Sequence, residues 1–131
     1  MNGKKARAGR GKEAERYGRF AEGVCVGILL CKGYHILARR HRTPVGEIDV
    51  VAKRGPTVVF VEIKARKNQE SAGEAITQRQ QSRILRAAEH FLGARPELAK
   101  ADIRFDAMLV GHRTLPHHVK DAWRRGFDGV R

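Results

Sequence analysis

Residues 46–66 constrain the fold of this chain more than any other stretch, because two apolar runs flank a turn signal there. The runs are GEIDVVA and TVVFVEIKA, and both are rich in the β-branched residues that favour strands. Arg54, Gly55 and Pro56 stand between them, and a glycine next to a proline is typical of a tight turn. The pattern predicts a β-hairpin. Its second strand is apolar on both sides, which indicates a central strand covered on both faces.

Three acids and a lysine are predicted to share one face of this hairpin. Side chains alternate along a strand, so Glu62 and Lys64 point the same way. A turn centred on the Arg-Gly pair would place Glu47 opposite Glu62 and Asp49 diagonal to it. A diagonal pair is roughly 7–8 Å apart at the backbone, which still lets two carboxylates share a cation. The alternative is a salt-bridged, solvent-facing side of a two-stranded ribbon.

The same residues carry a resemblance to known proteins. Asp49, followed after twelve residues by Glu62 and then Lys64 at the end of an apolar strand, resembles the PD-(D/E)xK nuclease signature. More closely, GEIDVVA with FVEIKAR resembles the YraN-like family of bacterial proteins, and the similarity extends from about residue 18 to residue 123. That resemblance implies a restriction-endonuclease-like fold and metal-dependent hydrolysis of phosphodiester bonds in DNA or RNA.

The resemblance also implies roles for particular residues. Asp49, Glu62 and the carbonyl of Ile63 would bind Mg²⁺ (or Mn²⁺), which prefers hard oxygen ligands. Lys64 would orient the attacking water, lower its pKa or neutralise the phosphate. A second ion would be held by Glu47 or by Glu22 of the first predicted helix.

One position departs from the family pattern. Family members usually carry a Lys-Gln pair at the start of the second predicted helix, and this chain has Gln80 and Gln81 there. Helical spacing places Gln80 near the strand ends, so we expect it in the site. The missing lysine leaves open a second reading, in which the protein binds nucleic acid without cleaving it.

The charge balance points to a polyanionic partner. Lys and Arg number 27 against 14 Asp and Glu, which gives a net charge of +13. Nucleic acid is the commonest polyanion that a small basic domain meets, and an anionic membrane surface is the alternative. Residues 1–12 predict a disordered basic arm that either clamps phosphates or is a solvated tail. The expected nucleic-acid contacts are Lys4, Lys5, Arg7, Arg10, Arg40, Arg42 and Arg66.

The cysteines and the apolar run around them favour a cytoplasmic protein without a membrane segment. Cys25 and Cys31 lie six residues apart in one predicted helix, too far apart along it to pair, and we expect both to be buried thiols. The apolar run at residues 23–31 is far shorter than the roughly 20 residues that span a bilayer. Acidic residues before it argue against a signal peptide.

The remaining elements complete a single predicted α/β domain over residues 13–131. A helix at 13–32 would bury a stripe through Phe20/Ala21, Val24, Ile28 and Cys31, and a strand at 34–39 would lead into a basic loop. A helix at 74–94 and a strand at 104–110 follow the hairpin, before a short terminal element. The expected fold is a mixed sheet flanked by helices, in the order helix-strand-strand-strand-helix-strand. His112, His117 and His118 are predicted to lie on the surface.

Overall fold

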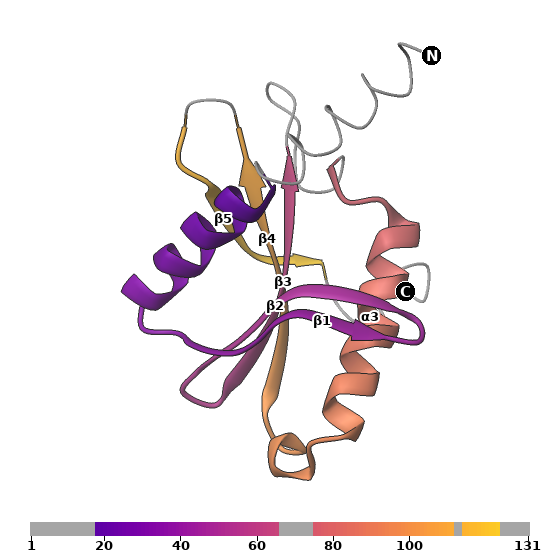
Figure 1. Cartoon of the computed structure of the whole chain (residues 1–131). Helices are drawn as coiled ribbons and strands as arrows, with labels where there is room; N and C mark the ends of the chain where they lie inside the picture. The colour runs from indigo at the N-terminus through magenta and orange to yellow at the C-terminus, as the bar shows by residue number, and fades with distance from the viewer. Residues whose placement is uncertain (1–17, 66–74, 112–113, 124–131) are drawn as a thin grey trace.

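The computed structural model describes residues 18–65, 75–111 and 114–123 of the chain (Figure 1). Five strands form one sheet in the order of the sequence. They are β1 (His35–Thr43), β2 (Gly46–Arg54), β3 (Thr57–Ala65), β4 (Asp102–Val110) and β5 (His117–Trp123). The helices are a first helix, described from residue 18 to 31, then α3 (Gln78–Gly93) and the short 3-10 helix η1 (Pro96–Leu98).

The sheet is mixed because α3 lies between β3 and β4 in the chain. β3 and β4 run parallel, whereas β1–β2, β2–β3 and β4–β5 are antiparallel pairs. Antiparallel strands can be joined by short turns, but a parallel pair needs a crossover, and α3 supplies it. The expected fold class, a mixed α/β sheet flanked by helices, is confirmed. The short terminal element proves to be the fifth strand.

The β2–β3 hairpin has a register two residues away from the prediction. Arg54 pairs with Thr57 and Val50 with Val61, so the two-residue turn is Gly55-Pro56 rather than Arg54-Gly55. Gly55 has φ +58° and proline fixes φ near −65°, the sign pattern of the II′ turn that suits twisted hairpins. A shift of two residues keeps every side chain of β3 on its predicted face.

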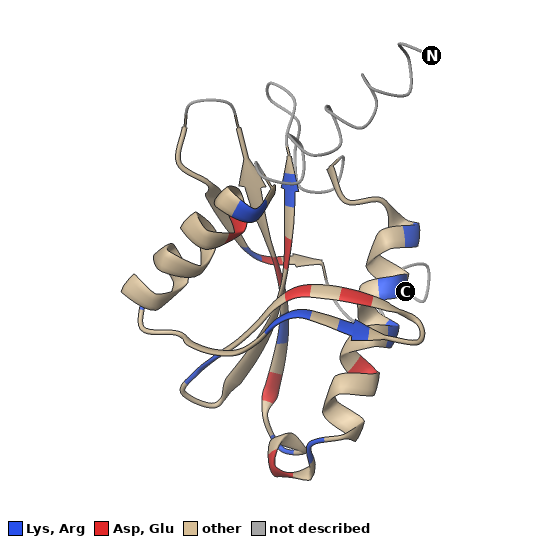
Figure 2. Ribbon diagram, viewed as in Figure 1, with Lys and Arg blue, Asp and Glu red and all other residues tan. Residues whose placement is uncertain are grey.

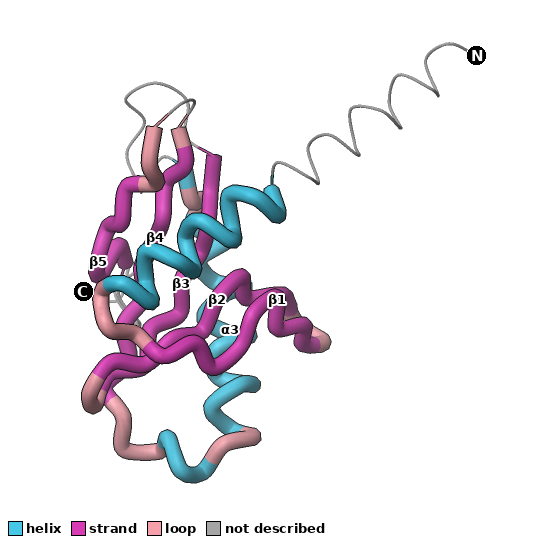
Figure 3. The backbone as a smooth tube through the Cα atoms, turned by 60° about the vertical axis from the view of Figure 1, so that its left-hand side comes forward, coloured by secondary structure: helices cyan, strands magenta, loops and turns pink. Residues whose placement is uncertain are grey.

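The sheet is the middle of three layers. In Figure 3 the first helix crosses in front of the strands and α3 lies behind them. β3 is covered on both faces, as predicted, because its residues from Val58 to Val61 are fully buried. Beneath α3 the core joins Val51, Val58, Phe60, Phe105, Ala107 and Leu109 to Ile84, Ala87, Ala88 and Phe91. Beneath the first helix it joins Val50, Ala52, Val59, Val61, Met108 and Val110 to Ala21, Cys25, Val26 and Leu29.

The first helix buries a different stripe from the predicted one. Ala21, Cys25 and Leu29 face the sheet, whereas Phe20 is 71% exposed and Cys31 is exposed. The expectation that both thiols are buried is therefore wrong for Cys31. Apolar residues occupy most positions of this helix, so spacing alone did not distinguish the buried stripe from its neighbour.

β1 continues through the segment predicted to be a basic loop. Arg39 pairs with Val50 of β2 and Arg42 pairs with Glu47, so the arginines project from a strand. Arg40 has φ +50°, a backbone conformation that is uncommon for residues other than glycine. The strand therefore carries a local irregularity where Arg39 and Arg40 are both exposed.

Candidate active site

The site is built where the β2–β3 pairing ends. Val50–Val61 is the last pair in this direction, and beyond it the Asp49 Oδ2 atom accepts a hydrogen bond of 2.8 Å from the Ile63 N–H. Alternation along β2 is interrupted here, since Ile48 and Val51 both pack beneath α3 while Val50 packs beneath the first helix. The Asp49 carboxylate thus accepts the hydrogen bond that a backbone carbonyl would accept in a regular strand pair. This bond holds the carboxylate beside β3.

Glu62 lies next to Asp49, and we call these two residues the carboxylate pair. Burial raises the pKa of Glu62 to about 9, with further increases from its hydrogen bond to Asp49 and from the negative charges of Asp49 and Glu47. The positive charge of Lys64 acts in the opposite direction. The structure therefore brings together Asp49, Glu62, Lys64 and Glu47. Among the described residues, Lys64 is the cation that opposes the negative charge of the pair.

The donor atoms of this site fit a hard divalent cation. Two carboxylates and a backbone carbonyl at Ile63 are oxygen ligands of the kind that Mg²⁺ and Mn²⁺ prefer. The raised pKa of Glu62 marks a place where a cation would relieve repulsion between acids. Within the described part of the chain no three His, Cys, Asp or Glu side chains gather into a metal-binding group, so water or substrate would complete the shell.

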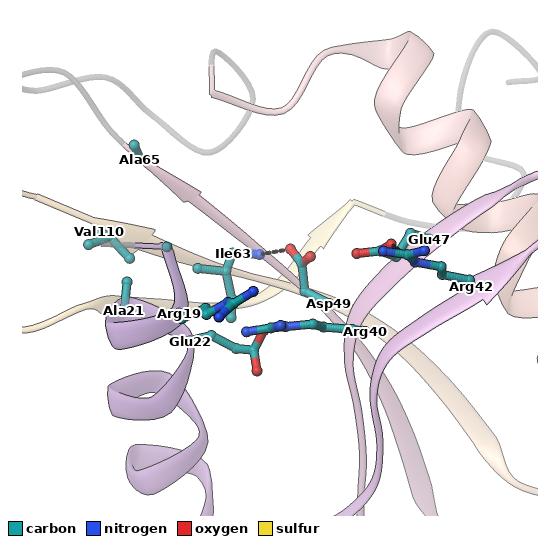
Figure 4. Close-up of a pocket in the computed structure, with 11 residues that line it drawn as sticks. Arg19, Ala21, Glu22, Arg40, Arg42, Glu47, Asp49, Ile63, Ala65 and Val110 are labelled. Atoms are coloured by element: carbon teal, nitrogen blue, oxygen red, sulfur yellow. Dashed lines mark hydrogen bonds and ion pairs between the residues drawn. The ribbon is translucent and has the colours of Figure 1, made fainter. Parts of the chain in front are cut away.

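A pocket of about 390 Å³ opens beside Asp49 (Figure 4). The close-up shows the guanidinium groups of Arg19 and Arg40 lying between the side chains of Asp49 and Glu22. The pocket is lined by Gly18, Arg19, Ala21, Glu22, Arg40, Arg42, Glu47, Asp49, Ile63, Ala65 and Val110. Acidic residues and arginines therefore share one hollow at the end of β2 and β3.

Glu22 lines this pocket but is held by two arginines. Its Oε2 atom accepts hydrogen bonds from Arg39 at 3.0 and 2.6 Å, and its Oε1 atom accepts one from Arg40 at 2.6 Å. Burial alone would raise the pKa of Glu22, but the hydrogen bonds and charges of Arg40 and Arg39 outweigh it and hold the pKa below its usual value. As a metal ligand, Glu22 would first have to leave these arginines, and that role stays a prediction.

Glu47 and Arg42 form an outer pair at the pocket. Arg42 Nε lies 3.1 Å from Glu47 Oε2, and the Arg42 side chain is 87% exposed. An ion pair this exposed contributes little to stability, with measured values of about 0–1 kcal/mol. Arg42 can therefore leave Glu47 for a phosphate at little cost.

Gln80 has a structural task in the absence of substrate. Thr77 is the N-cap of α3, and its side chain accepts a hydrogen bond from the Gln80 N–H. The Gln80 Oε1 atom in turn accepts the Thr77 N–H at 2.9 Å, which completes a capping box. A role for Gln80 in the site stays a prediction.

Several predicted nucleic-acid contacts lie outside the described residues. They are Lys4, Lys5, Arg7 and Arg10 of the basic arm, and Arg66 directly after β3. Arg19 is a pocket residue that the sequence reasoning missed. It stands three residues before Glu22, so helical spacing could have placed it on the same side of the first helix.

A second carboxylate is buried in the neighbouring strand β4. Asp106 accepts hydrogen bonds of 2.8 and 2.9 Å from Arg104, and one of 2.9 Å from the Asp121 N–H. His118 Nε2 lies 2.7 Å from Asp106. Burial alone would raise the pKa of Asp106, but hydrogen bonds from His118, Arg104 and Asp121 lower it below its usual value. Arg104, Asp106 and His118 form what we call the Asp106 cluster.

His118 is not the surface residue that was predicted. Its side chain is 3% exposed, because β5 turns it toward β4 and the end of the first helix. Lys32 Nζ lies 2.9 Å from His118 Nδ1, and an ammonium group only donates, so Nδ1 accepts and Nε2 carries the proton given to Asp106. Arg104 also donates to the Tyr34 hydroxyl group. Arg104 and Asp106, which share a face of β4, thus form an ion pair.

Comparison with known proteins places the chain in a family. The sequence model of Uncharacterised protein family UPF0102 matches residues 21–110, which include most of the first helix, the carboxylate pair with Lys64, and Arg104 and Asp106. The chain belongs to this family. A UPF0102 protein of Bradyrhizobium diazoefficiens is 51% identical over 110 residues, covering 84% of this chain and 83% of its own length. A UPF0102 protein of Parvibaculum lavamentivorans is 46% identical over 121 residues, covering 92% and 91%.

The expected YraN-like membership is thus confirmed, and the UPF0102 match covers all four residues brought together at the site. None of the helices in the described ranges combines the length and the apolar character that crossing a membrane requires.

Proposed function

We propose that this UPF0102 protein is a metal-dependent nuclease that hydrolyses phosphodiester bonds in nucleic acid. The observation that carries the proposal is the carboxylate pair beside Lys64, in which burial and the neighbouring acids raise the pKa of Glu62 and Asp49 lines a pocket shared with arginines. A purely structural cluster of acids would be expected to have its charge neutralised, because unpaired buried charge is costly. Clustered groups with strongly shifted pKa values are characteristic of functional sites.

In this proposal the chain's own residues hold and orient the reactants. Asp49, Glu62 and the Ile63 carbonyl would hold Mg²⁺ or Mn²⁺. When bound, the ion would polarise the scissile phosphate and acidify the attacking water. Lys64 lies on the same strand face as Glu62 and supplies positive charge as negative charge grows on the phosphoryl oxygens. The Ile63 N–H keeps Asp49 oriented while Glu62 changes protonation.

The arginines of the pocket have the complementary task of binding the phosphate backbone. Arg40 and Arg42 line the pocket with exposed side chains, and a guanidinium group suits bidentate contact with phosphate. Their present partners, Glu22 and Glu47, line the same pocket. A bound phosphate would compete with these carboxylates for the arginines. The proposal places this activity in the cytoplasm, where nucleic acid is at hand.

A second candidate function is binding of nucleic acid without hydrolysis. It is favoured by the engagement of Gln80 in the α3 cap and of both Glu22 oxygens with arginines. Under this alternative the carboxylate pair would hold a cation that only bridges to the backbone. The two functions predict different results for variants of the carboxylate pair. A nuclease would lose cleavage while it keeps binding, whereas a binding module would show no cleavage even as the wild type.

The test is cleavage of labelled nucleic acid with Mg²⁺ or Mn²⁺ by the wild type, Lys64→Ala and Asp49→Asn. We expect both variants to lose cleavage. Lys64→Ala should keep its affinity, since one of 27 cations contributes little to binding, and Asp49→Asn should bind at least as well because a negative charge is gone.

Lys53→Ala is the matched control, because Lys53 lies on β2 and, within the described ranges, its ammonium group bonds only to the Gly55 carbonyl at 2.7 Å. It should cleave like the wild type. Cleavage that survives in Lys64→Ala and Asp49→Asn would remove the assignment of this site. Binding by all four proteins, with no cleavage under either metal, would support the binding module.

A further inference from the structure

The exposed side of α3 carries a stripe of cations that the pocket does not use. Arg79, Arg83, Arg86 and His90 are all exposed and follow one another at intervals of four, three and four residues. At about 100° per residue they fall within an arc of about 60°, and they extend over about 16 Å of helix. We call Arg79, Arg83 and Arg86 the α3 arginine stripe. Figure 2 shows the positive segments recurring along α3 beside the β1–β2 hairpin.

The needs of the helix itself do not explain this stripe. Arg79 lies in the first turn of α3, where the positive end of the helix dipole disfavours a cation, and the first turn holds no acid. Among the residues that the structure describes, none forms an ion pair with the stripe. Glu89 stands three residues after Arg86, and no Glu or Asp stands three or four residues from Arg79 or Arg83. The stripe therefore presents unshared positive charge to solvent.

The fold joins the stripe to the pocket. Gly46, at the tip of the β1–β2 hairpin, packs so closely on α3 that a Cβ atom there would lie 3.5 Å from the Arg83 carbonyl oxygen. The same hairpin carries Arg40 and Arg42 to the pocket and Glu47 to the carboxylate pair. The hairpin tip thus lies between two basic surfaces, one at the pocket and one along α3.

We infer that the α3 arginine stripe is a backbone-binding surface and that its partner is double-stranded nucleic acid. The inference rests on the proposed function for the chemistry of the partner. One strand would reach the pocket, and the other would lie along α3 with the hairpin tip between the two. The three arginines span about 10 Å of helix axis, which corresponds to about three phosphates of one duplex strand, so their rigid spacing matches a regular backbone.

Single-stranded nucleic acid fits this surface less well. Proteins that bind single strands combine positive charge with aromatic side chains on which bases stack. The described residues of α3 and the β1–β2 hairpin include no exposed Phe, Tyr or Trp, since Phe91 of α3 is fully buried. Among its described residues the surface offers charge at regular intervals and no exposed Phe, Tyr or Trp on which an unpaired base would stack.

The test compares binding of a short DNA duplex and of its separated strand, with EDTA present so that no cleavage occurs. The variant R79E/R83E/R86E reverses the stripe, and K53E/K100E/K120E makes the same change of net charge on β2, after η1 and on β5. We expect the stripe variant to lose at least tenfold in duplex affinity beyond the control. Its slope of log affinity against log salt should fall by about two to three. For the single strand, both variants should lose affinity equally.

Equal losses by the two variants on the duplex, or an equal loss by the stripe variant on duplex and single strand, would overturn the inference. Glutamate in the first turn suits the helix dipole, so the stripe variant should fold, and thermal melting checks this. Arg83→Gln with Arg86→Gln gives a milder form that should shift duplex affinity in the same direction. Stripe-dependent duplex binding without any cleavage would sustain this inference and reject the nuclease. Cleavage that needs Lys64 but not the stripe would support the nuclease and reject this inference.

Discussion

The carboxylate pair and the Asp106 cluster lie on neighbouring strands, and each holds an acid that is removed from water. The pKa of Glu62 is raised, whereas the pKa of Asp106 is lowered. Asp106 is fully buried, yet hydrogen bonds from His118 and Arg104 and the charge of Arg104 hold its pKa below the usual value. Glu62 is less buried but has Asp49 and Glu47 as neighbours and only Lys64 opposing them, so its pKa rises to about 9. Burial alone therefore does not explain why the pKa values of Glu62 and Asp106 shift in opposite directions. The partners of each carboxylate explain it.

The difference teaches which acid serves the fold and which is available for chemistry. Asp106 accepts every hydrogen bond that its surroundings offer and ties β4 to β5 and to Tyr34 through Arg104. In the carboxylate pair, Asp49 lines a pocket, and burial and the neighbouring acids raise the pKa of Glu62. A cation would stabilise the pair, whereas the Asp106 cluster has nothing to gain from one.

The largest effect should come from breaking the compensated cluster. Asp106→Ala leaves Arg104 and His118 buried without their partner, so we expect the free energy of unfolding to fall by about 3–5 kcal/mol. Urea denaturation measures this. Asp102→Ala, at an exposed position of the same strand, is the control and should change the free energy by less than about 0.5 kcal/mol. An equally large loss for Asp49→Asn would erase the contrast between the two sites.

The next effect is the response to metal. Mn²⁺ at a hundred times its dissociation constant should raise the free energy of unfolding of the wild type by about 2.7 kcal/mol. Asp49→Asn and Glu62→Gln should lose this stabilisation, while Asp102→Asn should keep it. Thermal melting with and without Mn²⁺ gives the result. Stabilisation that is unchanged in both site variants would show that the ion binds elsewhere.

A smaller effect should appear in the pH dependence of stability. The pKa of Glu62 is raised from 4.5 to about 9, so the folded state holds a proton that the unfolded state releases, and stability falls as pH rises between these values. Glu62→Gln removes this slope and should melt on the order of a few °C higher than the wild type at pH 8 without metal.

Asp106 should give the opposite sign. Its pKa is lowered on folding, so its contribution is present above the pKa of the unfolded chain and is lost as pH falls through the folded value. Melting curves of the wild type and Glu62→Gln from about pH 2 to about pH 9 separate the two contributions. Parallel curves for the two proteins would contradict the raised pKa of Glu62.

The smallest effect concerns the outer layer of the Asp106 cluster. The Arg54 guanidinium group lies 4.5 Å from the centre of the Tyr34 ring, whose hydroxyl group accepts from Arg104. Arg54→Ala should lower the free energy of unfolding by about 0.5–1 kcal/mol through loss of this cation–π contact. Lys53→Ala is the neighbouring control. A loss as large as that of Asp106→Ala would mean that Tyr34 belongs to the centre of the cluster.

Local patterns predicted the hairpin, α3 and the carboxylate pair. The alternation of TVVFVEIKA determined which residues of β3 lie on each face, and the spacing of Ile84, Ala87, Ala88 and Phe91 determined the buried stripe of α3. The turn was misplaced by one residue because both Arg54-Gly55 and Gly55-Pro56 suit a turn. The side chains of β3 still lie on their predicted faces because the resulting register shift is an even number of residues.

Contacts between distant segments could not be predicted in this way. The first helix is apolar on most sides, so only packing against the sheet selected Ala21, Cys25 and Leu29 and exposed Phe20. Glu22 meets Arg39 and Arg40 because β1 continues past the point where a loop was expected. His118 meets Asp106 only because β5 pairs with β4.

The sequence by itself thus determined the β2–β3 hairpin, α3 and the set of acids beside Lys64, since side-chain periodicity and turn chemistry act over a few residues. Tertiary structure alone decided how each carboxylate is neutralised. Partners such as Arg39 for Glu22 and His118 for Asp106 come from other elements and leave no periodic trace in the sequence. The proton affinity of a carboxylate depends on its solvation and on the charges around it. For that reason the contrast between Glu62 and Asp106 exists only in the folded chain.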